Sequence, residues 1–238
     1  MDYQRIEQIH FPKVETSPIF VGRDAHLKKG AAGLEAGRVV FVHGEYGIGK
    51  SSFAKAMARN LGEPFGVLDL QRTAAQTLDT FILGARRKGL LKGLANPSKR
   101  KKQESFQDAQ EAFRFLVEKK GLGLLVLDNV FSATRPKLEF IAYLLKLELR
   151  LIIVMETDIH PDSLFQLRAV CQRDLQLKLP KLNALDSEAF LKEWQDHYGL
   201  ALSPKDLKRI AKQQNGYPQF LHERVMELHR HVPLYHPS

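Results

Sequence analysis

The chain of 238 residues is 44% hydrophobic and 26% charged, the composition of a globular protein that is large enough to bury a core. Its single cysteine, Cys171, excludes an internal disulfide framework. No apolar run approaches the roughly 18–20 residues of a membrane span, and the first residues lack the apolar core of a signal peptide. These features predict a cytoplasmic protein and argue against a disulfide-stabilised secreted domain.

The net charge of +9 is concentrated in one segment, residues 84–103. This segment holds eight of the 36 basic residues and no acidic residue, which leaves 28 basic residues against 27 acidic ones. Its basic residues are Arg86, Arg87, Lys88, Lys92, Lys99, Arg100, Lys101 and Lys102. Two interpretations stay open. The segment either contacts the phosphate backbone of DNA or RNA, or is a solvated loop.

Helix and strand patterns alternate over the first three-quarters of the chain. Short apolar runs predict buried strands at 38–42, 65–70, 122–128, 149–156 and 175–179. Helices are expected at 24–36, 50–62, 73–88, 104–121, 137–148 and 161–171. Strands that alternate with helices form parallel sheets with right-handed crossovers. We therefore expect one α/β domain at 18–182, behind an N-terminal extension at 1–17.

The pattern changes after Pro180, where three successive helices are expected at 186–199, 203–216 and 217–231. Asp186 and Ser203 are the predicted caps of the first two helices. These helices predict a small helical subdomain at 183–238. Within it we expect Trp194 and Tyr198 to form core packing rather than a platform for a base, and His222 to lie on a solvated face.

A phosphate-binding loop is indicated by the stretch GEYGIGKSS, which follows a predicted strand and opens a predicted helix. It matches the pattern G-x-x-x-x-G-K-[ST] through Gly44, Gly49, Lys50 and Ser51. The glycines let successive backbone N–H groups turn toward a phosphate, and the helix N-terminus adds partial positive charge. Lys50 is then expected to reach the β- and γ-phosphates, and the Ser51 hydroxyl to ligate magnesium.

A carboxylate on a neighbouring strand is needed to orient the magnesium shell. Asp128 ends the apolar run LGLLVLD and is the first candidate. Asp69 ends a shorter run, FGVLDL, and is the alternative. Both residues are expected at the carboxyl end of a parallel strand.

The group that activates water is less clearly indicated. Asn129 follows Asp128, and an amide can orient a water molecule but cannot take its proton. An acid at the end of the next strand, Glu156 or Asp158, is expected to help. Thr157, between them, is a candidate contact for the γ-phosphate.

Five segments together resemble the AAA+ superfamily and its relatives, the STAND signalling ATPases. They are PIFVGRDAHL (18–27), GEYGIGKSS as Walker A, LLVLDN as Walker B, IIVMETD as the sensor 1 strand, and NGYPQFL (215–221) as the lid turn. The resemblance implies a P-loop NTPase fold, with a five-stranded parallel sheet in the order 5-1-4-3-2 and a helical lid. It also implies ATP or ADP as ligand, with Mg.

The same resemblance implies which residues hold the nucleotide. Phe20, Val21, Gly22 and Arg23 would border the adenine, and Pro218 would lie against the base. The loop residues are Gly44, Glu45, Tyr46, Gly47, Ile48, Gly49, Lys50, Ser51 and Ser52. The chain departs from AAA+ motors at Asn129, where they have glutamate, and at Gln219, where a sensor arginine might follow. Both departures favour slow hydrolysis.

Three functions are compatible with these features. The first is an ATP-binding switch or slow ATPase that assembles with itself or a partner and acts on nucleic acid through residues 84–103. The second is a STAND-like signalling or defence regulator that gates a protein partner without nucleic-acid contact. The third, a small-molecule kinase, is disfavoured by the FVGR and GYP segments.

Overall fold

Five parallel strands form a single sheet in the computed structural model, which describes residues 20–94, 106–156 and 158–231. The strands are β1 Val39–His43, β2 Phe65–Asp69, β3 Leu124–Val130, β4 Arg150–Met155 and β5 Asp174–Lys178. Their spatial order is β2-β3-β4-β1-β5, which is the predicted order 5-1-4-3-2 read from the opposite edge. The predicted fold class is therefore confirmed. The predicted extension at 1–17, Lys99–Lys102 and Thr157 lie outside the described residues.

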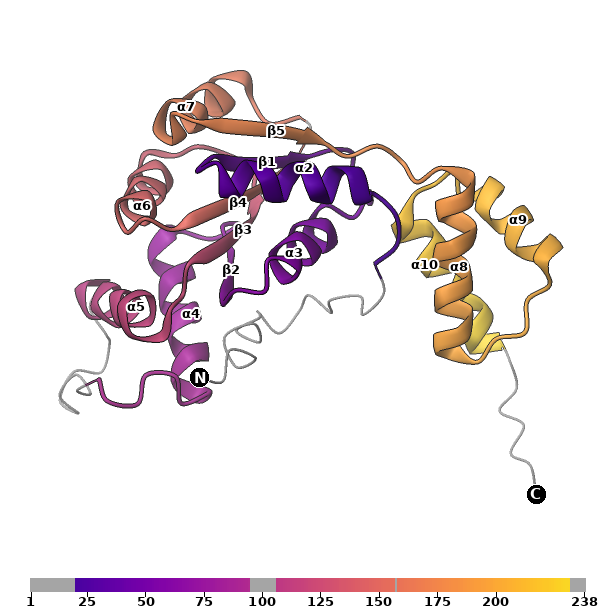
Figure 1. Ribbon diagram of the computed structural model, residues 1–238, viewed down its shortest axis with the longest axis horizontal. Coiled ribbons are helices and arrows are strands. Elements are labelled where there is room, and N and C mark those ends of the chain that lie inside the picture. Colours follow the sequence, from indigo (N-terminus) through magenta and orange to yellow (C-terminus); the bar gives the residue numbers. More distant parts are fainter. Residues whose placement is uncertain (1–19, 95–105, 157, 232–238) are drawn as a thin grey trace.

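Helices cover both faces of the sheet (Figure 1). One face carries α2 Asp24–Glu35 and α3 Lys50–Asn60. The other carries α4 Ala74–Arg87, α5 Phe106–Lys120, α6 Arg135–Lys146 and α7 Pro161–Cys171. Successive strand residues alternate between the two cores: Val40 and Val42 pack with α3, whereas Val39 and Phe41 face the opposite core. The strands are apolar along their length because both faces are covered.

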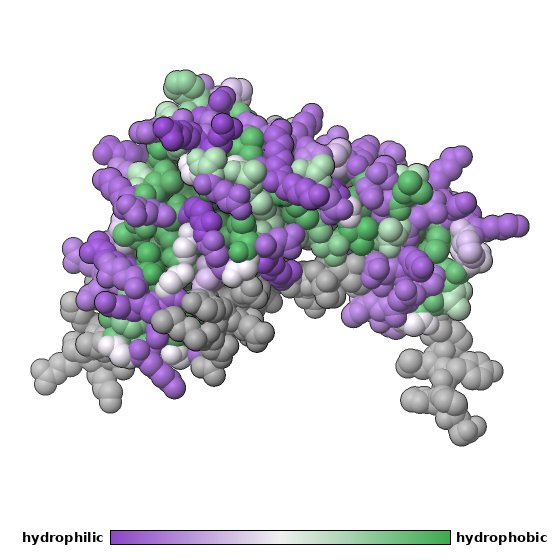
Figure 2. Space-filling view, in the orientation of Figure 1, coloured by the Kyte–Doolittle hydropathy of each residue, from purple (hydrophilic) through white to green (hydrophobic). Residues whose placement is uncertain are grey.

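A separate lobe follows β5 and consists of α8 Ala184–Tyr198, α9 Pro204–Gln213 and α10 Pro218–His231. It has a core of its own, built around Leu191, Trp194, Leu221 and Val225. Figure 2 shows the larger and the smaller lobe, with hydrophilic side chains around their edges and hydrophobic ones between them. The domain boundaries at 18 and 183 stay predictions.

Two local predictions are wrong. Strand β3 does not end at Asp128 but continues to Val130, with a register shift against β4 between Leu127 and Val130. Asn129 lies inside this irregularity with a φ of 58°, a left-handed conformation that asparagine tolerates better than most residues. The cap of α8 is Asn183, whose side chain accepts a hydrogen bond from the backbone N–H of Asp186. Asp186 therefore lies in the first turn.

Within the described ranges, no helix has the length and apolar character that crossing a membrane requires.

Candidate functional site

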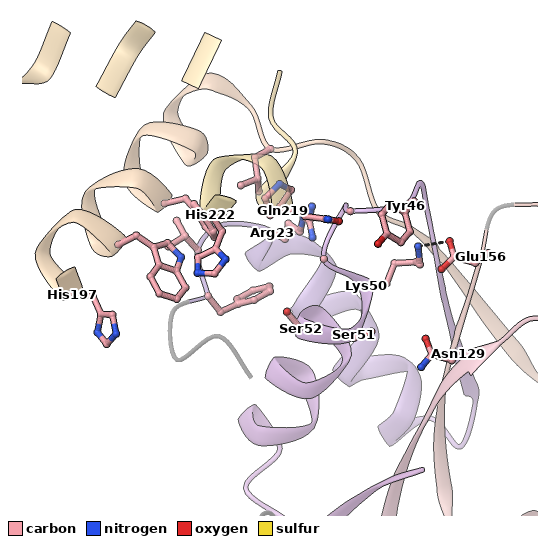
Figure 3. Close-up of a pocket in the computed structure, with 18 of the residues that line it drawn as sticks. Arg23, Tyr46, Lys50, Ser51, Ser52, Asn129, Glu156, His197, Gln219 and His222 are labelled. Atoms are coloured by element: carbon pink, nitrogen blue, oxygen red, sulfur yellow. Dashed lines mark hydrogen bonds and ion pairs between the residues drawn. The ribbon is translucent and has the colours of Figure 1, made fainter. Parts of the chain in front are cut away.

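A cavity of about 710 Å³ lies between the carboxyl edge of the sheet and the helical lobe. This volume falls within the roughly 300–1,000 Å³ typical of small-molecule sites. The cavity has two chemically different ends (Figure 3). The polar end is lined by Tyr46, Gly47, Gly49, Lys50, Ser51, Ser52, Asn129 and Glu156. The other end is lined by Phe20, Val21, Arg23, Leu182, Phe190, Trp194, His197, Tyr198, Pro218, Gln219 and His222.

The polar end is built on the loop between β1 and α3. Gly47 and Gly49 have φ values of 75° and 85°, which residues with a Cβ adopt only with strain. At Gly47 a Cβ would also come within 2.9 Å of the Gln219 side chain. These glycines let the backbone curl under the cavity and deliver α3 with its N-terminus facing inward. Such a loop and helix end can bind an anion.

Lys50, the first residue of α3, is buried with only 6% of its side chain exposed. Its ammonium donates hydrogen bonds to the carbonyl oxygens of Gly44 at 2.9 Å and Glu45 at 3.0 Å. It donates a third to the Glu156 carboxylate at 2.7 Å. The predicted acid at the end of β4 therefore contacts the phosphate-loop lysine directly.

Ser51, the residue after Lys50, pairs with Asp128. The Ser51 hydroxyl donates to Asp128 Oδ1 at 2.8 Å, although 77 residues separate them in sequence. Only 3% of Asp128 is exposed, and this burial raises the pKa of its carboxyl, opposed by the hydrogen bond from Ser51 and the charge of Lys55. A buried carboxylate beside a hydroxyl is a pair of hard oxygen donors of the kind Mg²⁺ prefers.

Asn129 is held by the strand on its other side. Its Nδ2 donates to Asp69 Oδ1 at 3.0 Å, since Asp69 and Asp128 are opposite each other in the β2–β3 register. The amide is thereby fixed with its nitrogen toward Asp69, and its Oδ1 is left to accept a hydrogen bond. Asp69 was the alternative to Asp128 as metal ligand. In the structure its carboxylate instead positions Asn129, the residue after Asp128.

Arg23 connects three parts of the site. Its guanidinium donates to the carbonyl oxygens of Ile48 in the phosphate loop at 2.7 Å and Pro180 in the β5–α8 connection at 3.0 Å. Burial lowers its pKa to about 10, while the nearby Asp186 of α8 opposes that shift. Arg23 therefore both lines the cavity and joins the phosphate loop to the β5–α8 connection.

The far end of the cavity is an aromatic cluster on α8 and α10. Trp194 is 3% exposed, and its ring lies 4.3 Å from that of His222 and stacks on Tyr198 at 5.4 Å. His197 meets the indole edge-on at 5.4 Å. Trp194 and Tyr198 thus belong to the lobe core and line the cavity together, and the expectation that His222 lies on a solvated face is wrong.

The lobe touches the phosphate loop at the start of α10. The Gln219 backbone N–H donates to the Gly47 carbonyl at 3.2 Å, and the Tyr217 phenol donates to the Glu45 carboxylate. The phosphate loop and the helical lobe are therefore in direct contact, so a shift of the loop backbone would alter its hydrogen bonds with the lobe.

Most residues predicted to hold a nucleotide line this cavity, but four do not. Gly22 lies against the Asp186 carboxylate, and Gly44 lies against the backbone of Leu179. The Ile48 side chain is buried in the core beside α3, and Glu45 faces Tyr217. The aromatic residues of α8 and His222 were missed as cavity residues. Their spacing fits a lobe core equally well, and only the placement of the lobe beside the loop distinguishes the two roles.

Comparison with known proteins gives the family. Residues 10–223 match the family described as Novel STAND NTPase 1. The chain belongs to this family. It is therefore a P-loop NTPase of the STAND and AAA+ type, as the resemblance of its motifs implied. Comparison with curated protein sequences found no significant match.

Solved structures share the fold of this STAND NTPase at low sequence identity. A Walker-type ATPase of Pyrococcus abyssi matches with a TM-score of 0.60 and 16% identity, over 90% of this chain and 69% of that one. The replication initiator DnaA, bound to AMPPCP and single-stranded DNA, matches at 0.53 and 18%, over 92% and 65%. The RuvB Holliday junction branch migration motor of Thermotoga maritima matches at 0.56 and 14%, over 89% and 63%. The chain thus spans about two-thirds of each relative.

Proposed function

We propose that this STAND NTPase binds ATP with Mg²⁺, hydrolyses it slowly and uses the bound nucleotide as a switch. The observation that carries the proposal is the Ser51–Asp128 hydrogen bond of 2.8 Å directly beside the Lys50 loop. The ammonium and the hydroxyl belong to the adjacent residues Lys50 and Ser51 at the start of α3, and the carboxylate of Asp128 meets them from β3. A triphosphate with its metal is the ligand whose charges match all three.

The two ends of the cavity suggest how ATP would lie. The phosphates would face Lys50 and the N–H groups of residues 47–52, and the base would lie among Phe20, Pro218 and the aromatic cluster of α8. In Figure 3, Lys50 and Asn129 lie at one side, with His222 and His197 at the other. A relative of the same fold has been solved with the triphosphate analogue AMPPCP, which agrees with this assignment.

Ser51 and Asp128 would hold Mg²⁺, which when bound would neutralise charge on the phosphate oxygens. Asn129 would orient the attacking water through its Oδ1. It has no carboxylate to accept a proton, so hydrolysis is expected to be slow. Glu156 is the acid beside the site that could accept the proton once it has left Lys50.

Binding and hydrolysis assays test this proposal. Lys50→Ala should weaken ATP binding by about tenfold or more, because charged hydrogen bonds of about 1.5–3 kcal/mol are lost. Asp128→Asn should remove the dependence on Mg²⁺. Lys29→Ala, an exposed lysine of α2, serves as the control and should leave both unchanged. Wild-type protein that binds no nucleotide with or without Mg²⁺ would overturn the proposal.

The partner of the switch is a second part of the proposal. The contacts of Tyr217 and Gln219 with the phosphate loop favour a regulator that presents its lobe to a protein. The alternative is nucleic acid, favoured by the eight basic residues of 84–103. Binding of DNA and RNA at several salt concentrations separates these functions. Loss of binding with a reduced salt slope on neutralising Lys99–Lys102 would support the alternative, and absence of binding at low salt would exclude it.

A further inference from the structure

The ammonium of Lys50 is fully engaged by its own chain. A lysine has three N–H donors, and here they go to Gly44 O, Glu45 O and Glu156 Oε2. The first two acceptors belong to the loop itself and are neutral. The third is a carboxylate that reaches Lys50 from the end of β4, 106 residues away. It is also the shortest of the three contacts, at 2.7 Å.

We propose that the Glu156 carboxylate is an internal substitute for the terminal phosphate of the nucleotide, and that the arriving phosphate displaces it from Lys50. The inference rests on the proposed function, because it assigns a competitor to the same phosphate site. It concerns how the site regulates its own occupancy.

Charge explains why a substitute is needed. Lys50 is only 6% exposed, and a buried ammonium without a counter-ion is costly. Asp128, the other nearby acid, is already bonded to Ser51 and to the backbone N–H of Asn129. Glu156 is therefore the carboxylate that balances Lys50 in this structure.

Geometry explains why the two anions compete. Glu156 lines the cavity and is 24% exposed, so its carboxylate stands in the space that a ligand enters. Figure 3 shows its bond to Lys50 pointing across the polar end of the cavity. Lys50 has no fourth N–H to offer. A phosphate oxygen that bonds to Lys50 must therefore replace Glu156 or one of the two loop carbonyls, and only Glu156 is carried by a different segment.

A displaced Glu156 would remain near the reacting groups. Met155, the residue before it, pairs with Val130, the residue after Asn129. The freed carboxylate would thus lie at the end of the strand next to Asn129. Ligand arrival would then both occupy Lys50 and release an acid at the edge of the cavity.

Equilibrium binding of a non-hydrolysable ATP analogue by calorimetry tests the proposal. Glu156→Gln keeps the shape of the side chain but removes its charge, so the variant should bind the analogue about tenfold more tightly than the wild type. AMP, whose single phosphate would not reach Lys50, should show no such gain. Asp162→Asn makes the same charge change at an 84% exposed position on α7 and should change neither affinity.

The outcomes are distinct. Equal or weaker binding of the analogue by Glu156→Gln, with a wild type that binds, would overturn the displacement and leave the proposed function standing. No binding by either protein would overturn both. Glu156→Ala provides a second variant with the same expectation. If neither variant folds, hydrogen exchange of wild-type β4 peptides decides: exchange at the carboxyl end should quicken with the analogue, and slower exchange there would refute the displacement.

Discussion

The phenol of Tyr217 donates a hydrogen bond to the carboxylate of Glu45, joining the helical lobe to the phosphate loop across 172 residues of sequence. The ammonium of Lys181, in the β5–α8 connection, lies 4.4 Å from the centre of the Tyr217 ring. This contact therefore links three segments: the loop, the lobe and the connection between them. Movement of the lobe away from the loop would have to break it.

Removing this hydrogen bond should loosen the lobe. Tyr217→Phe keeps the ring and its contact with Lys181 but removes the donor, at a cost of about 1–2 kcal/mol for a bond to a charged acceptor. We expect a fluorescent ATP analogue to dissociate about five- to tenfold faster, as measured by stopped flow.

Tyr143→Phe is the matched control for that experiment. Tyr143 does not line the cavity, and its hydroxyl donates to the Gln110 carbonyl oxygen of α5, so loss of this hydroxyl should leave the dissociation rate near the wild-type value. Equal rates for Tyr217→Phe and the wild type would show that the contact does not hold the lobe closed.

Asn129→Asp should make hydrolysis depend on pH. Aspartate tolerates the left-handed backbone at this position, and its carboxylate would lie beside that of Asp69, which now accepts from Asn129 at 3.0 Å. Like charges this close hold one proton to a higher pH than a single carboxylate does.

The protonated pair cannot accept a proton from water, so the rate of the Asn129→Asp variant should rise as pH rises through the shared pKa. The wild-type profile should lack this additional rise, because the amide of Asn129 does not titrate. A steady-state pH–rate profile measures both. Parallel profiles would mean that residue 129 is not at the attacking water.

Trp194 should report on the base without any label. It is the only tryptophan in the chain, and it lines the end of the cavity assigned to the base. ATP should therefore change its emission intensity in a saturable titration. Inorganic tripolyphosphate, which has no base, should compete with ATP but leave the emission unchanged. If ATP is shown to bind and the Trp194 emission does not change, the base does not lie at this end of the cavity.

Asp128→Asn should stabilise the ligand-free protein at neutral pH. Burial raises the pKa of Asp128 above its ordinary value, so the folded state holds the carboxylate less favourably than the unfolded chain does. This penalty is present above the folded-state pKa and disappears below the unfolded one. The melting temperature of the variant should exceed that of the wild type by a few degrees at neutral pH. The gain should vanish in acid, and a gain that persists there would point to another cause.

Gly216 should tolerate a Cβ much less than Gly199 does. Both have positive φ values, 74° and 63°, so alanine strains the backbone at either position by about 1 kcal/mol or more. At Gly216 the new Cβ would also come within 2.2 Å of the Leu182 carbonyl oxygen, whereas nothing lies within 4 Å at Gly199. Gly216→Ala should therefore lower the free energy of unfolding clearly more than Gly199→Ala in a urea titration. Equal losses would contradict the close contact.

The sequence could predict the sheet and the pairing of Ser51 with the Asp128 region because these depend on local patterns. An apolar run marks each covered strand, and parallel strands bring their carboxyl ends to one edge. The glycine-rich loop then fixes where α3 begins. Every one of the five strands lies within two residues of its predicted range at each end.

Contacts that depend on strand register could not be predicted from these local sequence patterns. Asp69 reaches Asn129 only because β2 and β3 pair with Asp69 opposite Asp128 and because β3 bulges after Leu127. The Glu156–Lys50 bond depends on the side-chain rotamers of one residue at the end of β4 and one at the start of α3. At α8, Asn183 and Asp186 are both good caps, and the choice of Asn183 starts the helix three residues earlier than a cap at Asp186 would.

The position of α8 has a mechanical consequence. Its 15 residues make a rod about 22 Å long, which starts just after the connection held by Arg23 and runs through the helical lobe beside α10 (Figure 1). A rotation of about 10° at that connection would carry the distal end of the rod through about 4 Å. Under the proposed function, such a rotation would make the helix a lever arm whose pivot is the β5–α8 connection, which Arg23 ties to the phosphate loop. A partner protein bound only at the distal end of α8 would then respond to the nucleotide state without contacting the nucleotide.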